Sequence, residues 1–263
     1  MFFGLTEEQD MIVKTVRSFV ENEIYPHENL VESKGFVPTE IAQDIKQKCI
    51  NLGFYACNFP ENIGGAGLNH LDFSLVEREL GRGSMALTHF FGRPQNILMA
   101  CKNDQIEKYL LPAVRGEVMD ALAMTEPDAG SDVRGMKCFA KSEGKDWIVN
   151  GTKHFISGAE HADFVIVFIA TGEEKTEKGP KKKITAFLVD RGTPGFVIRG
   201  GYNSVSHKGY KNMILEFDDC RLPKEQVLGE VHGGFEVMNT WLYATRLTVA
   251  AMSVGRARRC FDY

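Results

Sequence analysis

The spacing of apolar residues changes twice along the 263-residue chain. From residue 6 to 111 apolar residues recur at helical intervals, and from about 117 to 228 they form short runs between turn residues. Helical spacing returns from residue 233 to the last residue. Because a helix buries one stripe and a strand buries alternate side chains, a change of period indicates a change of architecture. The pattern predicts an α+β protein of several domains.

The first segment contains recognisable helix boundaries. Thr6 and Gln9 form a capping-box pattern, which predicts that a helix begins directly after Thr6. A second helix is predicted to begin at Pro38-Thr39-Glu40 and to end near Gly53. A third is predicted to end at Gly81, and further helical stretches are expected over 86–101 and 104–111.

The middle segment is rich in Val, Ile and Phe between Gly, Asp and Pro, which is typical of strands. Its apolar runs are DALAM, KCFAK, WIVNG, DFVIVFIA, ITAFLVD, GFVIRG and MILEF. Short strands at this spacing predict an antiparallel β-barrel or β-sandwich. Asn150-Gly151 is the residue pair of a type I′ turn, which predicts a β-hairpin joining WIV to HFIS.

Three domains follow from these patterns: an amino-terminal helical domain over 1–116, a middle β domain over 117–232, and a helix over 233–263. The last helix reaches Tyr263 without Gly, Pro or a capping residue, and its apolar stripe needs a partner surface. We expect it to be the first helix of a truncated carboxy-terminal helical bundle. The alternative is that this helix closes the fold.

Composition argues against several classes of function. The net charge of −4 gives no basic surface for nucleic acid. The longest apolar run, around 164–170, is too short to span a membrane, and no signal-peptide pattern is present. The six cysteines form no C-x-x-C pair and no zinc spacing, so no metal is expected. Scattered thiols in apolar patterns indicate a reducing compartment, and we expect a cytoplasmic protein.

The stretch MTEPDAGSD carries chemistry at the end of an apolar run. Thr125 and Ser131 offer hydroxyl groups, and Gly130 leaves the main chain open to close approach. Such a loop can bind carbonyls, ring nitrogens or a pyrophosphate. An ordinary strand-ending turn capped by Asp128 and Asp132 explains these residue types equally well.

A second stretch, NGTKHFISGAE, places Phe155 and Ser157 two residues apart, so that both side chains are expected on one face of a strand. An aromatic ring and a hydroxyl on one face can stack on a flat ligand and hydrogen-bond its edge. The competing interpretation is a core phenylalanine beside a surface serine.

The sequence resembles the acyl-CoA dehydrogenase family. The resemblance is carried by AMTEPDAGSD, IVNGTKHFISGAEHADFVIVFI and LEFDDCRLPKEQVLGEVHGGF, and by LGFYACNFPENIGGAGL and QIEKYLLPAVRGE nearer the amino terminus. These motifs stand in the family's order and cover essentially the whole chain. The order of helices, then strands, then a helix agrees with the family's architecture.

This resemblance implies FAD bound between the β domain and a carboxy-terminal helical domain. Thr125 and Ser157 would hydrogen-bond the edge of the flavin ring, and Phe155 would pack on it. Ser131 would contact FAD and help to position the thioester. The full set expected to contact FAD is Leu122, Ala123, Met124, Thr125, Gly130, Ser131, Phe155, Ile156 and Ser157, and the set expected to contact substrate is Ser131, Thr245 and Arg246.

The implied reaction is α,β-dehydrogenation of an acyl-CoA thioester to a trans-2-enoyl-CoA, as in fatty acid β-oxidation. Electron-transfer flavoprotein would be the acceptor, and the family is typically a homotetramer. A minority of members carry the catalytic Glu just before the residue that matches Arg246, where this chain has Thr245. We therefore find no catalytic residue in this chain and expect the Glu beyond Tyr263. The loop 204–212 also departs from the family pattern, with Lys208 standing for its Arg.

The sequence leaves two alternative functions open. The first is an oxygen-using relative, such as an acyl-CoA oxidase, a nitroalkane oxidase or a flavin monooxygenase, which would share the same motifs. The second is a non-catalytic protein that binds flavin or CoA, with the apolar stripe of 236–253 contacting a partner protein.

Overall fold

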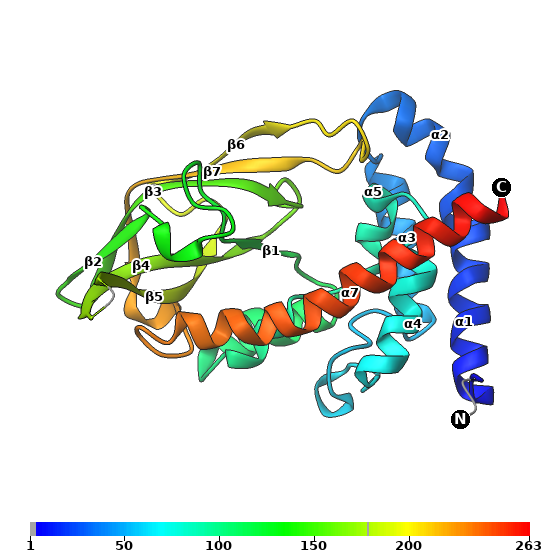
Figure 1. The fold of residues 1–263 in the computed structure, drawn as a ribbon, viewed down its shortest axis with the longest axis horizontal. Helices are drawn as coiled ribbons and strands as arrows, with labels where there is room; N and C mark the ends of the chain where they lie inside the picture. Colours follow the sequence, from blue (N-terminus) through cyan, green and yellow to red (C-terminus); the bar gives the residue numbers. More distant parts are fainter. Residues whose placement is uncertain (1–3, 178) are drawn as a thin grey trace.

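The computed structural model describes residues 4–177 and 179–263. Residues 1–3 of the expected amino-terminal domain and residue 178 of the expected β domain therefore lie outside the described residues. Helices occupy one end of the molecule and a curled sheet the other, and helix α7 runs along both (Figure 1). The order of helical and β regions confirms the fold class predicted from the sequence.

The amino-terminal region consists of short helices around one core. The predicted capping box is present, because the Thr6 hydroxyl accepts from the Gln9 amide and the Gln9 side chain accepts from the Thr6 amide. The helices are α1 (Glu7–Phe19), α2 (Tyr25–Lys34), α3 (Thr39–Asn51), α4 (His70–Leu80), α5 (Met85–Thr88) and α6 (Leu111–Val114), with π-helical turns at Val20–Ile24 and Ile106–Leu110 and 3₁₀ turns at Glu61–Ile63, His89–Phe91 and Asn96–Ala100.

The helix expected over 86–101 is interrupted. Gly92 has φ +84°, a conformation that a helix does not use, and Pro94 follows two residues later. The segment therefore forms α5 and two 3₁₀ turns, with residues 92–95 crossing between them. Residues 92–95 consequently line a cavity between the helical and β regions.

The β region forms one curled sheet. Its strands are β1 (Asp120–Ala123), β2 (Phe139–Glu143), β3 (Asp146–Ser157), β4 (Phe164–Thr176), β5 (Gly179–Asp190), β6 (Phe196–Tyr202), β7 (Asn212–Pro223) and β8 (Val227–Leu228), with 3₁₀ turns at Val133–Gly135 and Lys224–Gln226. Strands follow the order β6-β7-β3-β2-β4-β5-β8, and β1 pairs with β4. Most neighbours are antiparallel as predicted, but β1 and β2 each pair in parallel with β4.

The hairpin predicted at Asn150-Gly151 is wrong. These two residues lie inside the continuous strand β3, at an irregularity in its pairing with β7. The Asn150 side chain spans the gap, accepting from the Asp219 amide at 2.9 Å. A Cβ on Gly151 would lie 2.6 Å from the Cys138 Cα, so a close approach to the chain explains the glycine.

Helix α7 (Gly234–Asp262) joins the two regions (Figure 1). Its first turn packs on β5, and its carboxy-terminal half crosses α4. That crossing depends on two glycines. A Cβ on Gly255 would lie 1.8 Å from the Arg78 carbonyl oxygen, and a Cβ on Gly81 would lie 2.3 Å from the Met252 carbonyl oxygen. The last turn is also held by the ion pair of Arg259 with Glu28 of α2, with an Nη2–Oε2 distance of 2.6 Å.

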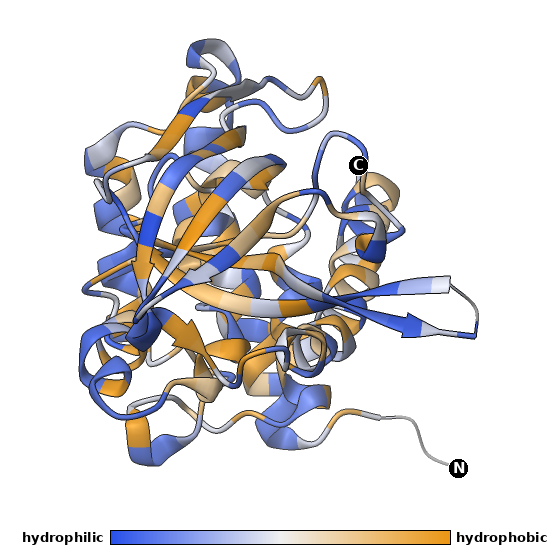
Figure 2. Ribbon diagram, turned by 90° about the vertical axis from the view of Figure 1, so that its left-hand side faces the viewer, coloured by the Kyte–Doolittle hydropathy of each residue, from blue (hydrophilic) through white to orange (hydrophobic). Residues whose placement is uncertain are grey.

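Apolar residues of the helices and of one face of the sheet form a common core. Figure 2 shows that the paired strands β4 and β5 become hydrophilic toward the outer part of their hairpin, where Glu173 pairs with Lys182. Five of the six cysteines are buried as expected, but Cys260 on α7 is exposed. Within the described part of the chain, no helix combines the length and hydrophobicity needed to cross a bilayer.

The α4–α7 crossing makes a prediction about stability. Gly255→Ala should lower the free energy of unfolding by about 1–3 kcal/mol, because the added methyl group cannot fit against the Arg78 carbonyl. Helix propensity alone would change stability by about 1 kcal/mol in the opposite direction. Urea denaturation measures the difference. Gly200→Ala, at a position with open space around it, is the control; equal effects of the two variants would contradict the close crossing.

Candidate functional site

The sequence-predicted turn after β1 is compact. The Glu126 amide donates to the Ala129 carbonyl at 2.9 Å, and the Ala129 amide returns a bond to the Glu126 carbonyl at 3.3 Å. Asp132 caps the next 3₁₀ turn by accepting from the Arg134 amide. Asp128 instead pairs with the Lys137 side chain, so only one of the two caps expected for a strand-ending turn is present. The turn leaves Ser131 exposed, and a Cβ on Gly130 would meet no atom within 4 Å.

A buried ion pair ties this turn to strand β3. The Lys153 Nζ lies 2.6 Å from the Glu126 Oε1, and the two side chains are 0% and 3% exposed. Lys153 also donates to the Met124 carbonyl at 3.1 Å, and the carboxylate of Glu126 accepts from the amide of Cys138. The His154 amide donates to the Thr125 carbonyl at 2.8 Å. These bonds fix the turn against the strand that carries Phe155 and Ser157.

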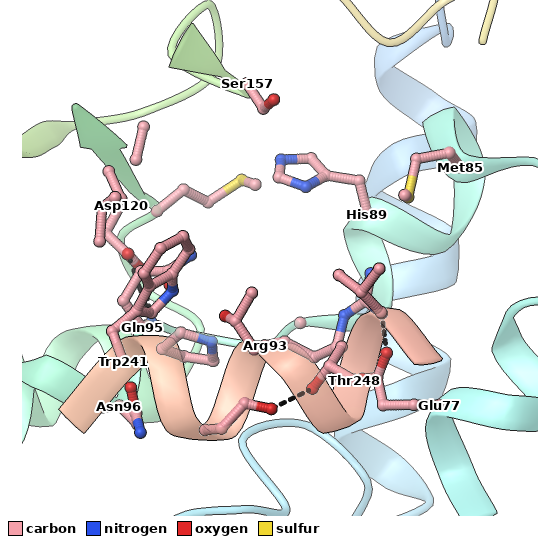
Figure 3. Close-up of a pocket in the computed structure, with 18 of the residues that line it drawn as sticks. Glu77, Met85, His89, Arg93, Gln95, Asn96, Asp120, Ser157, Trp241 and Thr248 are labelled. Atoms are coloured by element: carbon pink, nitrogen blue, oxygen red, sulfur yellow. Dashed lines mark hydrogen bonds and ion pairs between the residues drawn. The ribbon is translucent and has the colours of Figure 1, made fainter. Parts of the chain in front are cut away.

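A cavity of about 580 Å³ opens between the sheet, the helical region and α7 (Figure 3). Seven of the sequence-predicted site residues line it: Leu122, Met124, Thr125, Phe155, Ile156, Ser157 and Thr245. Residues from three distant parts of the sequence thus meet at one cavity. Of the other predicted residues, Ala123 is buried in the core, whereas Gly130, Ser131 and Arg246 are exposed and do not line the cavity.

Phe155 is in an unusual conformation. Its φ of +58° falls in the left-handed region, which is rare for a bulky residue. The pairing of β3 with β7 is irregular between Lys153 and Ile156, so Phe155 lies in a bulge. Its ring is 55% exposed and stacks on Tyr202 at 4.7 Å between centroids. A strained, exposed aromatic at a cavity wall is a feature often found at ligand sites.

Ser157 lies at the end of β3 with two polar neighbours. Its hydroxyl donates to the Asn212 Oδ1 at 2.8 Å. Burial raises the pKa of Tyr210, and a hydrogen bond with Ser157 opposes that rise. Tyr210 also packs edge-on against the His89 ring, with centroids 5.4 Å apart. The unfamiliar loop 204–212 therefore contributes a tyrosine to the cavity wall.

The sequence did not identify the charged residues of this cavity. The Arg93 Nη1 lies 2.7 Å from the Glu77 Oε2, and Glu77 is fully buried on α4. Arg93 also donates to the Thr88 carbonyl at 3.2 Å. The second carboxylate oxygen of Glu77, Oε1, is buried without a hydrogen-bond partner. The available signal for Glu77 was its place on the apolar stripe of α4, four residues after Phe73 and three before Leu80.

Asp120 and His89 also line the cavity. The carboxylate of Asp120 accepts long bonds, of 3.3 and 3.4 Å, from the Gln95 amide. Burial raises its pKa to about 7, although its surface is not wholly covered because it opens onto the cavity. Burial lowers the pKa of His89 to about 3, so this ring is neutral at physiological pH. Figure 3 shows the His89 ring between Ser157 and Arg93.

Comparison with known proteins identifies the architecture. The family model for the acyl-CoA dehydrogenase N-terminal domain matches residues 6–117, and the model for the acyl-CoA dehydrogenase middle domain matches residues 121–220. Together these two matches cover most of the chain.

Individual relatives agree with the family models. The human mitochondrial short-chain specific acyl-CoA dehydrogenase is 32% identical over 264 residues, which are 98% of this chain and 62% of that protein. Subunit CarC of the caffeyl-CoA reductase-Etf complex of Acetobacterium woodii is 32% identical over 268 residues, 100% of this chain and 68% of that protein. This chain therefore spans less than two thirds of the human relative's length.

A solved structure has the same fold. The glutaryl-CoA dehydrogenase of Mycobacterium smegmatis in complex with FADH2 superposes with a TM-score of 0.85 at 26% identity. The match covers 98% of this chain and 64% of that one.

The buried ion pair makes a prediction. Lys153→Met leaves the Glu126 carboxylate buried without a charged partner, so the free energy of unfolding should fall by about 3–5 kcal/mol. The double variant Lys153→Met/Glu126→Gln should lose less than the two single variants together. Denaturant unfolding of the four proteins tests both statements. Lys137→Met, which removes the exposed partner of Asp128, is the control and should have no measurable effect; additive losses in the double variant would contradict the pairing.

Asp120 makes a prediction about pH. An acid whose pKa is higher in the folded than in the unfolded protein favours folding only while it is protonated, so its contribution is lost as pH rises from about 4 to about 7. The wild type should therefore lose up to about 4 kcal/mol relative to Asp120→Asn over this range. Chemical unfolding at several pH values measures the difference. A difference that stays constant with pH would contradict burial of this carboxyl group.

Proposed function

The chain belongs to the acyl-CoA dehydrogenase family, and we propose that it binds FAD and takes part in the α,β-dehydrogenation of an acyl-CoA thioester. The observation that carries the proposal is the convergence of the turn after β1, the end of β3 and the middle of α7 on one cavity. We also propose the three-domain division of 1–116, 117–232 and 233–263, because the β region ends shortly after β8 and α7 begins at Gly234 as one continuous helix.

The residues at this cavity fit a flavin. The exposed ring of Phe155 offers a stacking surface, and the hydroxyls of Thr125 and Ser157 lie beside it at the cavity wall. The accessible backbone around Gly130 and Ser131 suits close approach of a polar group such as a pyrophosphate. When bound, FAD would supply the acceptor for the hydride that leaves the β carbon.

Leu122, Met124 and Ile156 line the cavity, and we propose that they pack around the cofactor, with the buried Ala123 supporting them from the core. Thr245 would contact substrate from α7, and Ser131 and Arg246 would bind its CoA portion from the surface. Arg246 is exposed, with its guanidinium 6.0 Å from the Tyr243 ring centroid, so it is available to a ligand phosphate.

The reaction also needs a base that removes the α-proton. Thr245 occupies the position where some relatives carry Glu, and a threonine hydroxyl cannot accept that proton efficiently at neutral pH. Glu126 is unsuitable because its carboxylate is buried in the pair with Lys153. The expectation that the base lies beyond Tyr263 stays a prediction, as does a homotetrameric assembly.

Electron-transfer flavoprotein is our proposed acceptor, because the relative CarC is named as a subunit of an Etf complex.

Anaerobic titration of the flavin-loaded full-length protein tests this function. We expect the yellow flavin band to bleach on addition of an acyl-CoA, and Ser157→Ala to slow bleaching roughly tenfold by removing one hydrogen bond. Ser142→Ala, on the exposed face of β2, is the matched control. Flavin that no acyl-CoA reduces would refute the dehydrogenase proposal, and peroxide formed stoichiometrically in air would favour an oxygen-using relative.

A further inference from the structure

The cavity contains more ionisable groups than an apolar acyl chain requires. Glu77, Arg93, His89 and Asp120 all line it, together with the amides of Gln95 and Asn96. Figure 3 shows that Glu77, Arg93 and Met85 extend from the helical side, whereas Ser157 and Asp120 extend from the strands. The polar groups on the helical side are therefore separate from the residues proposed to hold the flavin.

The polar groups on the helical side have unused hydrogen-bonding capacity. Glu77 is 0% exposed, and its Oε1 has no partner although its Oε2 is paired with Arg93. The His89 Nε2 is also buried without a partner. Buried polar atoms are normally bonded, because each unpaired one loses its hydration without compensation. An apolar acyl tail would leave Glu77 in this state, whereas a tail with its own hydroxyl could bond it.

The charges in the cavity favour a neutral group. Arg93 supplies one positive charge against the carboxyl groups of Glu77 and Asp120. Burial raises the pKa of both carboxyl groups, with Arg93 opposing the rise at Glu77. The Glu77 carboxylate already pairs with Arg93 at 2.7 Å, and His89 adds no charge because burial lowers its pKa to about 3. A charged tail would add an uncompensated charge beside the buried Glu77–Arg93 pair, but a hydroxyl would not.

We propose that the cavity selects acyl thioesters whose tail carries a neutral hydroxyl group on or beyond the γ carbon, with Glu77 and Arg93 as the selecting residues. The inference rests on the proposed function, because the α and β carbons must stay free for dehydrogenation. A hydroxyl can donate to the free oxygen of Glu77 and accept from an N–H of Arg93, which an alkyl group cannot do.

The test compares thioesters of matched size with the flavin-loaded full-length protein. We expect kcat/KM for 5-hydroxyvaleryl-CoA to exceed that for its isostere hexanoyl-CoA at least tenfold, since a site built to bond a hydroxyl rejects the analogue without one. 5-Aminovaleryl-CoA and glutaryl-CoA place a cation and an anion at the same point of the tail. Preference for hexanoyl-CoA, or for either charged tail, would overturn the proposal.

A variant pair identifies the residues responsible. Glu77→Met/Arg93→Met replaces the whole ion pair with apolar groups of similar size, so the preference should reverse in favour of hexanoyl-CoA. Glu79→Met/Arg17→Met removes an ion pair outside the cavity whose carboxylate lies on the same helix as Glu77, and this variant should keep the hydroxyl preference. Unchanged selectivity in the first double variant would overturn the assignment. If that variant does not fold, the wild-type preference across the four thioesters still decides the proposal.

A measurement of thioester binding distinguishes failure of the hydroxyl-selectivity proposal from failure of the proposed dehydrogenase function. The shift in melting temperature of the flavin-loaded protein with 5-hydroxyvaleryl-CoA and with hexanoyl-CoA compares binding without requiring turnover. A larger shift with the hydroxylated thioester, without flavin reduction by any thioester, would support the selective cavity and refute the dehydrogenase activity. Equal shifts together with flavin reduction would refute the selectivity and support the activity.

Discussion

The ion pair of Lys153 with Glu126 is the contact on which the site depends, because it joins the turn after β1 to the end of β3. Each charge is buried, so neither can be satisfied by water, and moving the turn would separate the two charges inside the protein. The amide of His154 and the carbonyl of Thr125 add a backbone bond at the same junction. Phe155 and Thr125 consequently face one cavity although they are thirty residues apart.

Helix α7 provides the opposite wall of that cavity, and its position depends on the absence of side chains. Gly81 and Gly255 allow α4 and α7 to approach until backbone meets backbone. Thr245 and Trp241 then line the same space as the strand residues. The close crossing also presses Met252 against Arg93, with Nη1 and Sδ 3.9 Å apart. Packing of one helix thus shapes both the cavity and its charged end.

Much of the candidate site was recognisable from sequence, since Thr125 and Ser157 lie in contiguous motifs with characteristic residue types. The charged residues were not recognisable, because Glu77, Arg93 and Asp120 come from separate segments with no shared motif. Local rules also failed where a tertiary contact overrode them. Asn150-Gly151 has the composition of a hairpin turn, yet pairing with β7 keeps it inside a strand.

The sequence by itself determined the order of helical and β regions and the helix start at Thr6, because spacing and capping act over a few residues. It also contained the motifs from which the residues that contact a flavin are predicted. Only the tertiary structure decided that Arg93 pairs with Glu77 at the cavity wall, and that the second carboxylate oxygen of Glu77 has no partner. Burial and pairing are properties of the packed chain, since they depend on which distant residues exclude water from each group.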